Sequence, residues 1–400
     1  MWYDKEDMKL LIVCQFYYPE NFVITKIAER LAALGHDVTV LTGKPNYGFD
    51  HILEEYKNVK YEEVNGVKIH RVNLFARKKS RLSIIRNYLS FWANSKKLVR
   101  NCKEKYDLVY SMSLSPVTIL SAGNLYKKKH KVPHVVHCVD LWPESTLITH
   151  AVKKDSIVYK VLYKWSRSLY SHADKVLIGS PSFKEYFENV LKLPVDNISF
   201  VPQPALVEDV TCETKDLGDG FNILYCGNLG RIQLIPYIVE SMKYVKNDKV
   251  KFHVIGMGPL QEKLVSLIKE NNMEDKIIYH GPIPAKKAAE YFKGSDCLYV
   301  SLGKEGYVGK TIPNKLMMSM IFSKPVLGVL VGDGRDTLIN SKAGVVAEED
   351  PKDIASKIDY LASLSKEELK KLGRNGQAYY LDNFSQEKVV NLIDSCFKSF

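Results

Sequence analysis

A glycine-rich turn near the middle of the chain carries residues suited to phosphate chemistry. Residues 226–231, CGNLGR, follow a short apolar run and precede apolar residues at helical spacing from Ile235 to Val245. A strand that turns through glycine into a helix presents backbone N–H groups and the positive end of a helix dipole. The alternative is an ordinary βα turn that binds nothing. The candidate ligand-binding residues are Gly227, Asn228, Gly230, Arg231 and Gln233.

Three further stretches of the second half have a similar character. Residues 256–259, GMGP, form another glycine turn, and residues 301–307 form a polar loop after an apolar run. Residues 311–316, TIPNKL, lead through Pro-Asn into a helix and again offer free N–H groups at a helix start. The helix that follows is rich in methionine, which is more typical of a core than of a ligand pocket. These stretches add Gly256, Asn314 and Lys315 to the candidates.

In the first half, residues 137–145, HCVDLWPES, place two carboxylates directly after an apolar run. Side chains that leave the carboxyl end of a parallel strand face the ligand site, where an acceptor hydroxyl needs a hydrogen-bond partner or a base. Asp140 is the candidate for that role, with Glu144 nearby. The alternative is that Asp140 or Glu144 caps the next helix and Trp142 is core. We expect His137 to be a packed histidine.

The elements that must position these residues alternate between strands and helices. Residues 9–15 form an apolar run typical of a buried parallel strand, and apolar positions from Ile24 to Leu34 mark a helix that ends at Gly35. This alternation predicts a parallel, doubly wound α/β sheet with ligands beyond the carboxyl ends of its strands. It continues over residues 36–41, 64–72, 81–102, 108–112, 115–126, 132–138, 175–178 and 197–201.

The pattern restarts after a polar linker over residues 208–220. Two successive α/β units predict two Rossmann-like domains that face each other across a cleft. We place the first domain at residues 1–205 and the second at 206–380. Residues 381–400 are expected to form a C-terminal helix, with a crossing back to the first domain as one option.

Composition excludes several classes of protein. The chain has 400 residues, 46% of them hydrophobic and 26% charged, as folded two-domain proteins do. Its seven cysteines are scattered and lack a C-x-x-C pair, so neither a disulfide framework nor a zinc site is indicated. No leader peptide and no apolar run of ~20 residues is found, so we expect a cytoplasmic protein.

The net charge of +11 has one main source. Residues 71–131 contain 15 basic side chains against two acidic ones. Within them, residues 81–102 combine basic side chains with an apolar, aromatic helical face, which is the composition of an in-plane membrane helix. The alternatives are a core-facing helix with a solvated rim and a nucleic-acid surface, for which no motif is present. The expected apolar face contains Leu82, Ile85, Tyr88, Leu89, Trp92 and Val99, with Phe91 alongside.

Taken in order, these motifs resemble those of glycosyltransferases of the GT-B fold. The resemblance is to the large retaining family 4 and its branch that builds bacterial surface polysaccharides such as capsule and O-antigen. Each motif is loose by itself, but their order and spacing are specific and run nearly end to end. The matching stretches are 16–20 (FYYPE), 35–42 (GHDVTVLT), 140–145 (DLWPES), 227–233 (GNLGRIQ), 256–259 (GMGP), 313–316 (PNKL), 324–326 (KPV), 332–334 (GDG) and 340–346 (NSKAGVV).

The resemblance implies an acceptor-binding first domain and a second domain that binds a nucleotide diphosphate sugar, expected to be UDP-linked. In the family, residues equivalent to 228–233 contact the diphosphate, and two glutamates separated by seven residues hold the sugar and the ribose. Aligned on residues 324–325, that pair falls at Lys310 and Met318, neither of which has a carboxylate. Glu305 is the acidic residue that the resemblance offers in its place.

The resemblance also implies a reaction. The sugar moves to an acceptor hydroxyl with retention at the anomeric carbon, and the departing diphosphate takes the acceptor's proton on the same face. Arg231 and Lys315 stabilise the developing charge, and Asp140, Glu144 and Glu305 form the catalytic set. No cofactor and no metal are expected, because basic side chains and helix ends offset the phosphate charge.

The expected partners are the nucleotide sugar, a lipid-linked saccharide acceptor and the anionic inner face of the plasma membrane, but no nucleic acid. Two alternatives stay open. One is a GT-B nucleotide-sugar epimerase, and the other is a non-catalytic nucleotide-sugar-binding protein, which the missing glutamate would fit. The residues assigned to the acceptor and the membrane are Tyr18, Glu20, Arg86, Trp92 and Lys96.

Overall fold

The computed structural model describes residues 7–78, 80–148, 150–207 and 210–400. The chain divides into two compact units, each with its own sheet. The first unit contains residues 1–203 and 386–400, and the second contains residues 204–385. The sequence places the division at residue 205 and the start of the C-terminal segment at residue 381.

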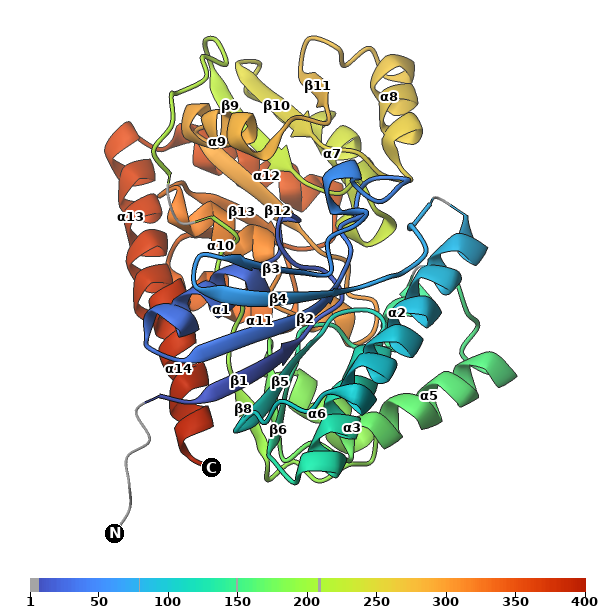
Figure 1. Ribbon diagram of the computed structural model, residues 1–400. Coiled ribbons are helices and arrows are strands. Elements are labelled where there is room, and N and C mark those ends of the chain that lie inside the picture. The colour runs from blue at the N-terminus through green and yellow to red at the C-terminus, as the bar shows by residue number, and fades with distance from the viewer. Residues whose placement is uncertain (1–6, 79, 149, 208–209) are drawn as a thin grey trace. The chain divides into compact units, whose positions relative to one another are not determined.

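The first unit is a doubly wound sheet with strand order β3-β4-β2-β1-β5-β6-β7-β8 (Figure 1). Its side chains alternate between two apolar cores, as strand geometry requires. Leu10 and Ile12 of β1 pack with α1 and α14, whereas Leu11 and Val13 pack with α2 and α3. The elements are β1 Lys9–Val13, α1 Val23–Ala33, β2 Asp37–Gly43, β3 Tyr61–Val64, β4 Val67–Val72, α2 Arg81–Asn101, β5 Leu108–Ser113, α3 Leu120–His130, β6 His134–Cys138, α4 Glu144–Ile148, α5 Ile157–Tyr170, β7 Lys175–Ile178, α6 Phe183–Asn189, β8 Ile198–Phe200 and α14 Gln386–Lys398.

One edge of this sheet differs from the sequence-based expectation of a single strand over residues 64–72. The structure has a hairpin there, in which β3 pairs antiparallel with β4. Asn65 and Gly66 form its turn, with φ angles of 51° and 76°. Two successive residues at positive φ are what the tightest hairpin turn requires, and Asn-Gly is its preferred sequence.

The second unit is a parallel sheet with strand order β11-β10-β9-β12-β13-β14. Ile223 and Tyr225 of β9 pack with α7 and α12, whereas Leu224 packs toward α9 on the opposite face. The elements are β9 Phe221–Cys226, α7 Ile235–Met242, β10 Val250–Ile255, α8 Gln261–Glu270, β11 Ile277–Gly281, α9 Ala285–Gly294, β12 Cys297–Ser301, α10 Asn314–Ile321, β13 Val326–Val329, α11 Gly332–Ser341, β14 Gly344–Ala347, α12 Pro351–Ser363 and α13 Lys366–Asn383.

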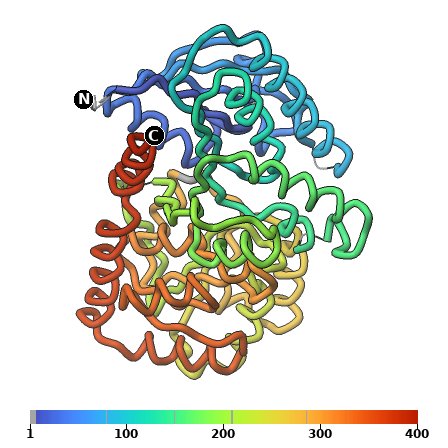
Figure 2. Tube along the Cα trace, turned by 90° about the horizontal axis from the view of Figure 1, so that it is seen from below, coloured from blue at the N-terminus to red at the C-terminus, as the bar shows by residue number. Residues whose placement is uncertain are grey.

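The last helix, α14, belongs to the first unit, although the long helix before it belongs to the second (Figure 2). Its apolar side chains, among them Val390 and Phe397, lie in the core formed with β1 and α1. His36, buried at the start of β2, contacts the Asp394 carboxylate of α14 at 2.9 Å. Arg30 of α1 donates to Gln386 at 3.2 Å.

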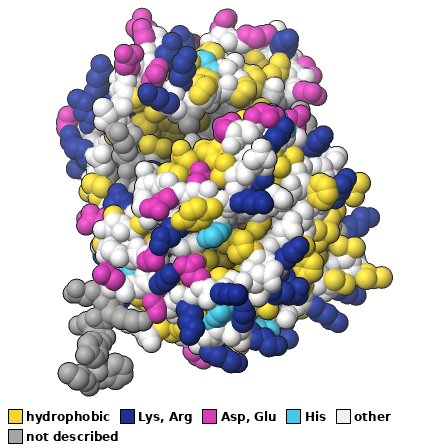
Figure 3. Space-filling view, viewed as in Figure 1, with side chains coloured by type: hydrophobic (Ala, Val, Ile, Leu, Met, Phe, Trp, Pro, Cys, Tyr) yellow, Lys and Arg dark blue, Asp and Glu magenta, His cyan; other side chains and the backbone are white. Residues whose placement is uncertain are grey.

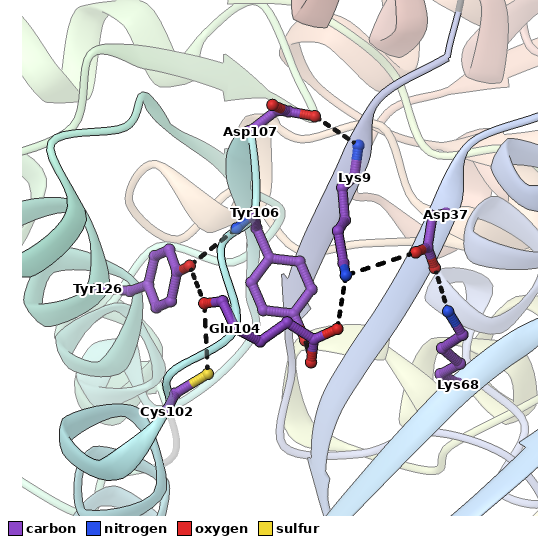
Figure 4. A network of polar contacts seen from close by, with 8 residues as sticks. All are labelled: Lys9, Asp37, Lys68, Cys102, Glu104, Tyr106, Asp107 and Tyr126. Carbon is purple, nitrogen blue, oxygen red and sulfur yellow. Dashed lines mark hydrogen bonds and ion pairs between the residues drawn. The ribbon is translucent and has the colours of Figure 1, made fainter.

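The amino ends of the strands in the first unit are tied by a polar network (Figure 4). Lys9 Nζ lies 2.6 Å from Glu104 Oε1, and Lys68 Nζ lies 2.8 Å from Asp37 Oδ1. The hydroxyl of Tyr106 donates to Glu104 at 2.8 Å. These charged groups at the amino ends of the strands are therefore paired with each other. The carboxyl ends carry the candidate site residues.

Candidate active site

Two glycine turns touch each other at the carboxyl ends of β9 and β10. Gly227 donates to Ile255 O at 2.9 Å, and Leu229 donates to Met257 O at 2.9 Å. A Cβ on Gly256 would lie only 1.8 Å from Gly227 O, and Gly256 has φ +140°. Both contact and conformation therefore demand glycine here. The sequence-predicted residues Gly227 and Gly256 are thus brought together.

A 3-10 turn over Arg231–Gln233 separates the first glycine turn from α7. Contrary to the expectation from the sequence, the helix therefore does not follow the glycine turn directly, because this 3-10 turn lies between them. Ser301 Oγ donates to Gln233 O at 2.6 Å, and Gly303 donates to Ile232 O at 2.6 Å, so this turn is fastened to the end of β12. Arg231 is exposed, and its guanidinium bonds to no described residue.

Lys315, at the start of α10, reaches across the first glycine turn. Its Nζ donates to the Tyr225 hydroxyl at 2.6 Å and lies 4.3 Å from the centre of that ring. The Tyr225 hydroxyl donates in turn to Asn228 O at 2.6 Å. A Cβ on Gly227 would meet Lys315 Cε at 2.3 Å, so only glycine leaves room for this lysine.

The charge of Lys315 has no carboxylate partner among the residues that the structure describes. Burial lowers its pKa to about 8, because desolvation disfavours the ammonium. A bound anion would stabilise this buried ammonium, because it would offset the free energy lost on desolvation. Lys315 and the glycine turn that it crosses, residues 226–231, together form what we call the second-unit anion site. The amides of Gly227 and Leu229 donate within the fold, so Lys315 supplies the charge of this site.

The neighbouring loop places the remaining donor-side candidates differently. Glu305 is exposed, and Lys310 lies with its Nζ 5.3 Å from the centre of the Tyr307 ring. Asn314 donates through its side chain to Pro204 O at 3.0 Å. Met318 packs against the apolar core of α10 and α13, and Met317 and Met320 are buried, as expected for a core methionine run.

In the first unit, Asp140 lies at the carboxyl end of β6 within a small hydroxyl cluster. Its Oδ2 accepts from Ser115 Oγ at 2.6 Å, and Ser115 Oγ lies 3.0 Å from Ser145 Oγ. The carboxylate also accepts from Ser145 and from the Leu141 amide. Burial nevertheless raises the pKa of Asp140. None of these contacts caps a helix through Asp140. The other part of that alternative is confirmed, because Trp142 is core at 8% exposed.

His137 is packed, as predicted. It is fully buried, with Nε2 donating to Val201 O at 2.9 Å and Nδ1 accepting from the Tyr110 hydroxyl at 2.8 Å. Burial lowers its pKa to about 4, so the ring is neutral. Both ring nitrogens are engaged, which leaves none for chemistry.

Glu144 and Glu20, both placed by sequence among the site residues, are engaged in structural contacts. Glu144 Oε1 accepts from the Tyr159 hydroxyl of α5 at 2.5 Å. Glu20 accepts from the amides of Asn46 and Tyr47 at 2.6 and 2.5 Å, and it holds the loop after β2. The carbonyl of Tyr18 accepts from Arg71 at 2.6 Å.

The expected apolar face of the basic helix is divided between the core and the solvent. The buried stripe of α2 contains Phe91 and Val99 together with two polar residues, Asn87 and Ser95. Leu82, Ile85 and Leu89 are instead 66%, 52% and 45% exposed. The buried residues are spaced four apart, from Asn87 to Val99, so they form one stripe along the helix that faces the sheet. The exposed apolar residues lie outside this stripe.

The three residues of α2 assigned to the acceptor and the membrane each contact an aromatic ring. Trp92 is half-buried, donates to Ser121 Oγ at 3.1 Å and meets Trp165 of α5 edge to face at 5.8 Å. Lys96 lies 4.3 Å from the Trp92 ring, and Arg86 lies 4.3 Å from the Phe75 ring.

Several site residues escaped sequence reasoning. Tyr225 has the pattern of an ordinary strand residue, and Ser115 belongs to no motif, so only the fold brings them to Lys315 and Asp140. Ser145 lies in the stretch over residues 140–145, but its type and spacing do not indicate its contact with Asp140. Helix α5 did carry a signal, because Ser156 precedes an amphipathic run and accepts from the Tyr159 amide at 3.1 Å.

Comparison with known families matches both units. The family described as "Glycosyl transferase 4-like domain" matches residues 21–204, and the family described as "Glycosyl transferases group 1" matches residues 220–363. The two matches meet near the division between the units.

Individual proteins are similar over much of the chain. A protein named as a glycosyltransferase, WbjE of Pseudomonas aeruginosa, is 26% identical over 65% of this chain and 66% of its own length. WcaI of Escherichia coli, named for colanic acid biosynthesis, is 26% identical over 77% of this chain and 80% of its own length. The crystal structure of Anabaena HepE with UDP and glucose superposes with a TM-score of 0.69, at 14% identity, over 98% of this chain and all of that one. This last likeness concerns the fold.

Proposed function

Because the chain belongs to family 4 of the glycosyltransferases with the GT-B fold, we propose that it transfers a sugar from a UDP-linked donor to an acceptor hydroxyl. The relatives named for colanic acid biosynthesis support a role in polysaccharide biosynthesis. We further propose that the acceptor is a lipid-linked saccharide and that the transfer proceeds with retention, as the resemblance to family 4 implies. The observation that carries the proposal is the second-unit anion site, where the buried ammonium of Lys315 lies against the glycine turn without a carboxylate partner among the described residues.

The anion site suits the leaving group. A departing nucleoside diphosphate gains negative charge in the transition state, and preorganised N–H groups and an ammonium stabilise that charge without rearranging. Lys315 is already held by Tyr225, and the exposed Arg231 supplies a second cation. The solved structure of HepE with UDP and glucose supports UDP as the nucleotide.

The acceptor side rests on Asp140. Its carboxylate is oriented by Ser115 and Ser145 at the carboxyl end of β6, where an acceptor hydroxyl would bind. In this proposal Asp140 positions the hydroxyl, and the departing diphosphate accepts its proton. Glu144 lies nearby, at the start of α4, and one of its oxygens accepts from Tyr159, so we assign the positioning role to Asp140 rather than to Glu144.

The ribose is the part of the donor for which the chain departs from its family. Met318 packs on the core, and Lys310 lies over Tyr307, so neither offers an acceptor to the ribose hydroxyls. We assign that contact to the exposed carboxylate of Glu305. No cofactor and no metal enter the proposal.

We also propose that the first unit binds the anionic inner face of the plasma membrane through α2 and α5. Neither helix contains an acidic residue, and Trp92 and Trp165 join them. Ile157, Val158 and Val161 of α5 are 80%, 56% and 56% exposed, and Leu82, Ile85 and Leu89 of α2 are also exposed. Yellow and dark blue side chains intermingle over this region on the right of Figure 3. Among the described residues, no helix is both long and apolar enough to cross a bilayer.

The experiment that tests the proposal combines binding with transfer. Thermal shift with a panel of UDP-, GDP- and dTDP-sugars identifies the donor, because a ligand selective for the native state raises the melting temperature. The selected donor is then incubated with a lipid extract as acceptor source, and labelled glycolipid is measured. Asp140→Asn should bind donor normally and lose transfer. Isomerised donor without acceptor would indicate the epimerase, and binding without transfer or hydrolysis would indicate the non-catalytic protein.

A further inference from the structure

Arg77, in the segment between β4 and α2, is held in an aromatic clamp. Its guanidinium lies 5.1 Å from the centre of the Tyr47 ring and 5.5 Å from that of Tyr88. Its Nη1 donates to the Tyr88 hydroxyl at 3.0 Å. The side chain is half-buried, so the charge is fixed in place while part of it stays accessible.

The clamp supplies no negative charge. Among the described residues, Arg77 has no carboxylate partner. Arg71, at the end of the same strand, shows the contrast: it is buried and pairs with Glu62, and its remaining donors bind the carbonyls of Gly43 and Tyr18. Arg71 is therefore neutralised within the fold, and Arg77 is not.

Buried amides hold the backbone at Arg77. Asn46 Oδ1 accepts from the Arg77 amide at 3.0 Å and from Asn87 Nδ2 at 3.0 Å. Asn87 Oδ1 in turn accepts from Gln15 Nε2 at 2.7 Å. Gln15, Asn46 and Asn87 are each at most 1% exposed, so this amide network fixes where the clamp stands.

The clamp lies on the acceptor side of the first unit. The network connects it to residues that follow the carboxyl ends of β1 and β2. Tyr88 is close enough to Asp140 for that carboxylate to raise the pKa of the phenol, in addition to the larger effect of burial. The exposed apolar residues of α2 begin at Leu82, directly after the clamp in sequence.

We propose that Arg77 and the Tyr88 hydroxyl bind the phosphate group of the acceptor, with its lipid directed along Leu82, Ile85 and Leu89. The proposal rests on the proposed function, since it assigns a phosphate-bearing acceptor to that reaction. A guanidinium offers two parallel N–H donors to phosphate oxygens, and Arg77 keeps donors beyond the one that Tyr88 receives. The apolar residues beside it suit an alkyl chain.

The test uses octyl phosphate below its micelle concentration, with inorganic phosphate and octyl glucoside as separate arms, and measures binding by calorimetry. Arg77→Gln should weaken octyl phosphate binding by about tenfold or more, and Arg77→Lys by less, because lysine cannot bind two oxygens at once. Lys78→Gln is the matched control, since it removes the adjacent exposed charge and should change binding by less than about twofold. Tyr88→Phe should weaken binding without removing the charge.

The arms separate the sources of the phosphate. Octyl phosphate binding more tightly than inorganic phosphate, with both lost in Arg77→Gln, supports a lipid-linked phosphate. Equal affinity for the two, equal losses in Arg77→Gln and Lys78→Gln, or unchanged binding in Arg77→Gln would overturn the assignment. UDP binding serves as the fold check, because Arg77→Gln should leave it unchanged. Loss of UDP binding by the unmodified chain would instead count against the proposed function.

Discussion

The ammonium of Lys315 lies 2.6 Å from the hydroxyl of Tyr225, and that hydroxyl donates onward to the carbonyl of Asn228. A single tyrosine thus ties the cation of one element to the glycine turn of another. The tie matters for binding because a lysine on a flexible four-carbon stem loses much rotational freedom when it meets a ligand. Here Tyr225 has already fixed it.

The first prediction concerns the pH dependence of UDP binding. Burial holds the pKa of Lys315 near 8 in the free protein, and a bound diphosphate should raise it. Affinity should therefore be constant below pH 8 and fall above it, approaching about tenfold per pH unit until the pKa of the complex is reached. Lys315→Arg should bind UDP without this decline, because guanidinium does not titrate there. Calorimetric titrations from pH 6.5 to 9.5 measure both. A parallel decline in the two proteins would contradict the assignment.

The second prediction concerns the contact between the two glycine turns. Gly256→Ala should destabilise the second unit by more than about 2 kcal/mol and weaken UDP binding, since its Cβ would lie 1.8 Å from Gly227 O. Gly281→Ala is the matched control, because Gly281 also has a positive φ, +73°, but no atom within 4 Å of its added Cβ. The control should cost only about 1 kcal/mol. Urea denaturation measures the free energy of unfolding of both variants. Equal losses of stability would show that the positive φ alone, and not the contact with Gly227, makes Gly256→Ala destabilising.

The two-unit architecture and most of its elements could be predicted from the sequence, because their signals are local. Short apolar runs, such as residues 9–13 of β1 and residues 221–226 of β9, identify strands from the sequence alone. The hairpin of β3 and β4 is not among the predicted elements, although the Asn65-Gly66 sequence is typical of a tight hairpin turn. The alternation of strands and helices in the rest of the chain favours an all-parallel sheet instead.

The candidate site was only partly predictable, because hydrogen-bond partners are set by the fold. Glycine turns and Lys315 stand out by type and spacing. Nothing local indicates that the Tyr159 hydroxyl donates to Glu144, or that the backbone amides of Asn46 and Tyr47 donate to Glu20. Likewise, the helical spacing of α2 groups Leu82 with Val99, but it does not show that Val99 is buried against the sheet while Leu82 is exposed.

The third prediction concerns acid stability of the first unit. Burial lowers the pKa of His134 to about 3 and that of His137 to about 4, against about 6.5 in the unfolded chain. The unfolded state thus binds protons first as the pH falls, so stability is full above pH 6.5 and is lost below it, with each histidine adding about 1.4 kcal/mol per pH unit. All four tryptophans lie in the first 203 residues, so fluorescence-detected urea unfolding reports on this unit.

A variant pair tests the source of that slope. His137→Asn removes one protonation site from the unfolded state, so its stability should fall less between pH 6.5 and pH 5 than that of the unmodified chain, whatever its stability at neutral pH. Val136→Ala removes a buried aliphatic side chain of the same strand instead, without removing a titratable group, and should keep the full slope. An unchanged slope in His137→Asn would assign the acid sensitivity elsewhere.

The fourth prediction concerns membrane binding through α5. Ile157→Ser together with Val161→Ser should weaken binding to vesicles containing anionic lipid by about tenfold or more, because burying two such side chains contributes roughly 2 kcal/mol. The matched control changes Ile339 and Leu381 of the second unit to serine, since these are 53% and 55% exposed and lie outside the proposed surface. Binding should also weaken with added salt, because basic residues of α2 and α5 contribute through the surface potential. Vesicle sedimentation measures each protein. Equal sedimentation of the two double variants, or binding that ignores the anionic lipid, would exclude the two helices as the membrane surface.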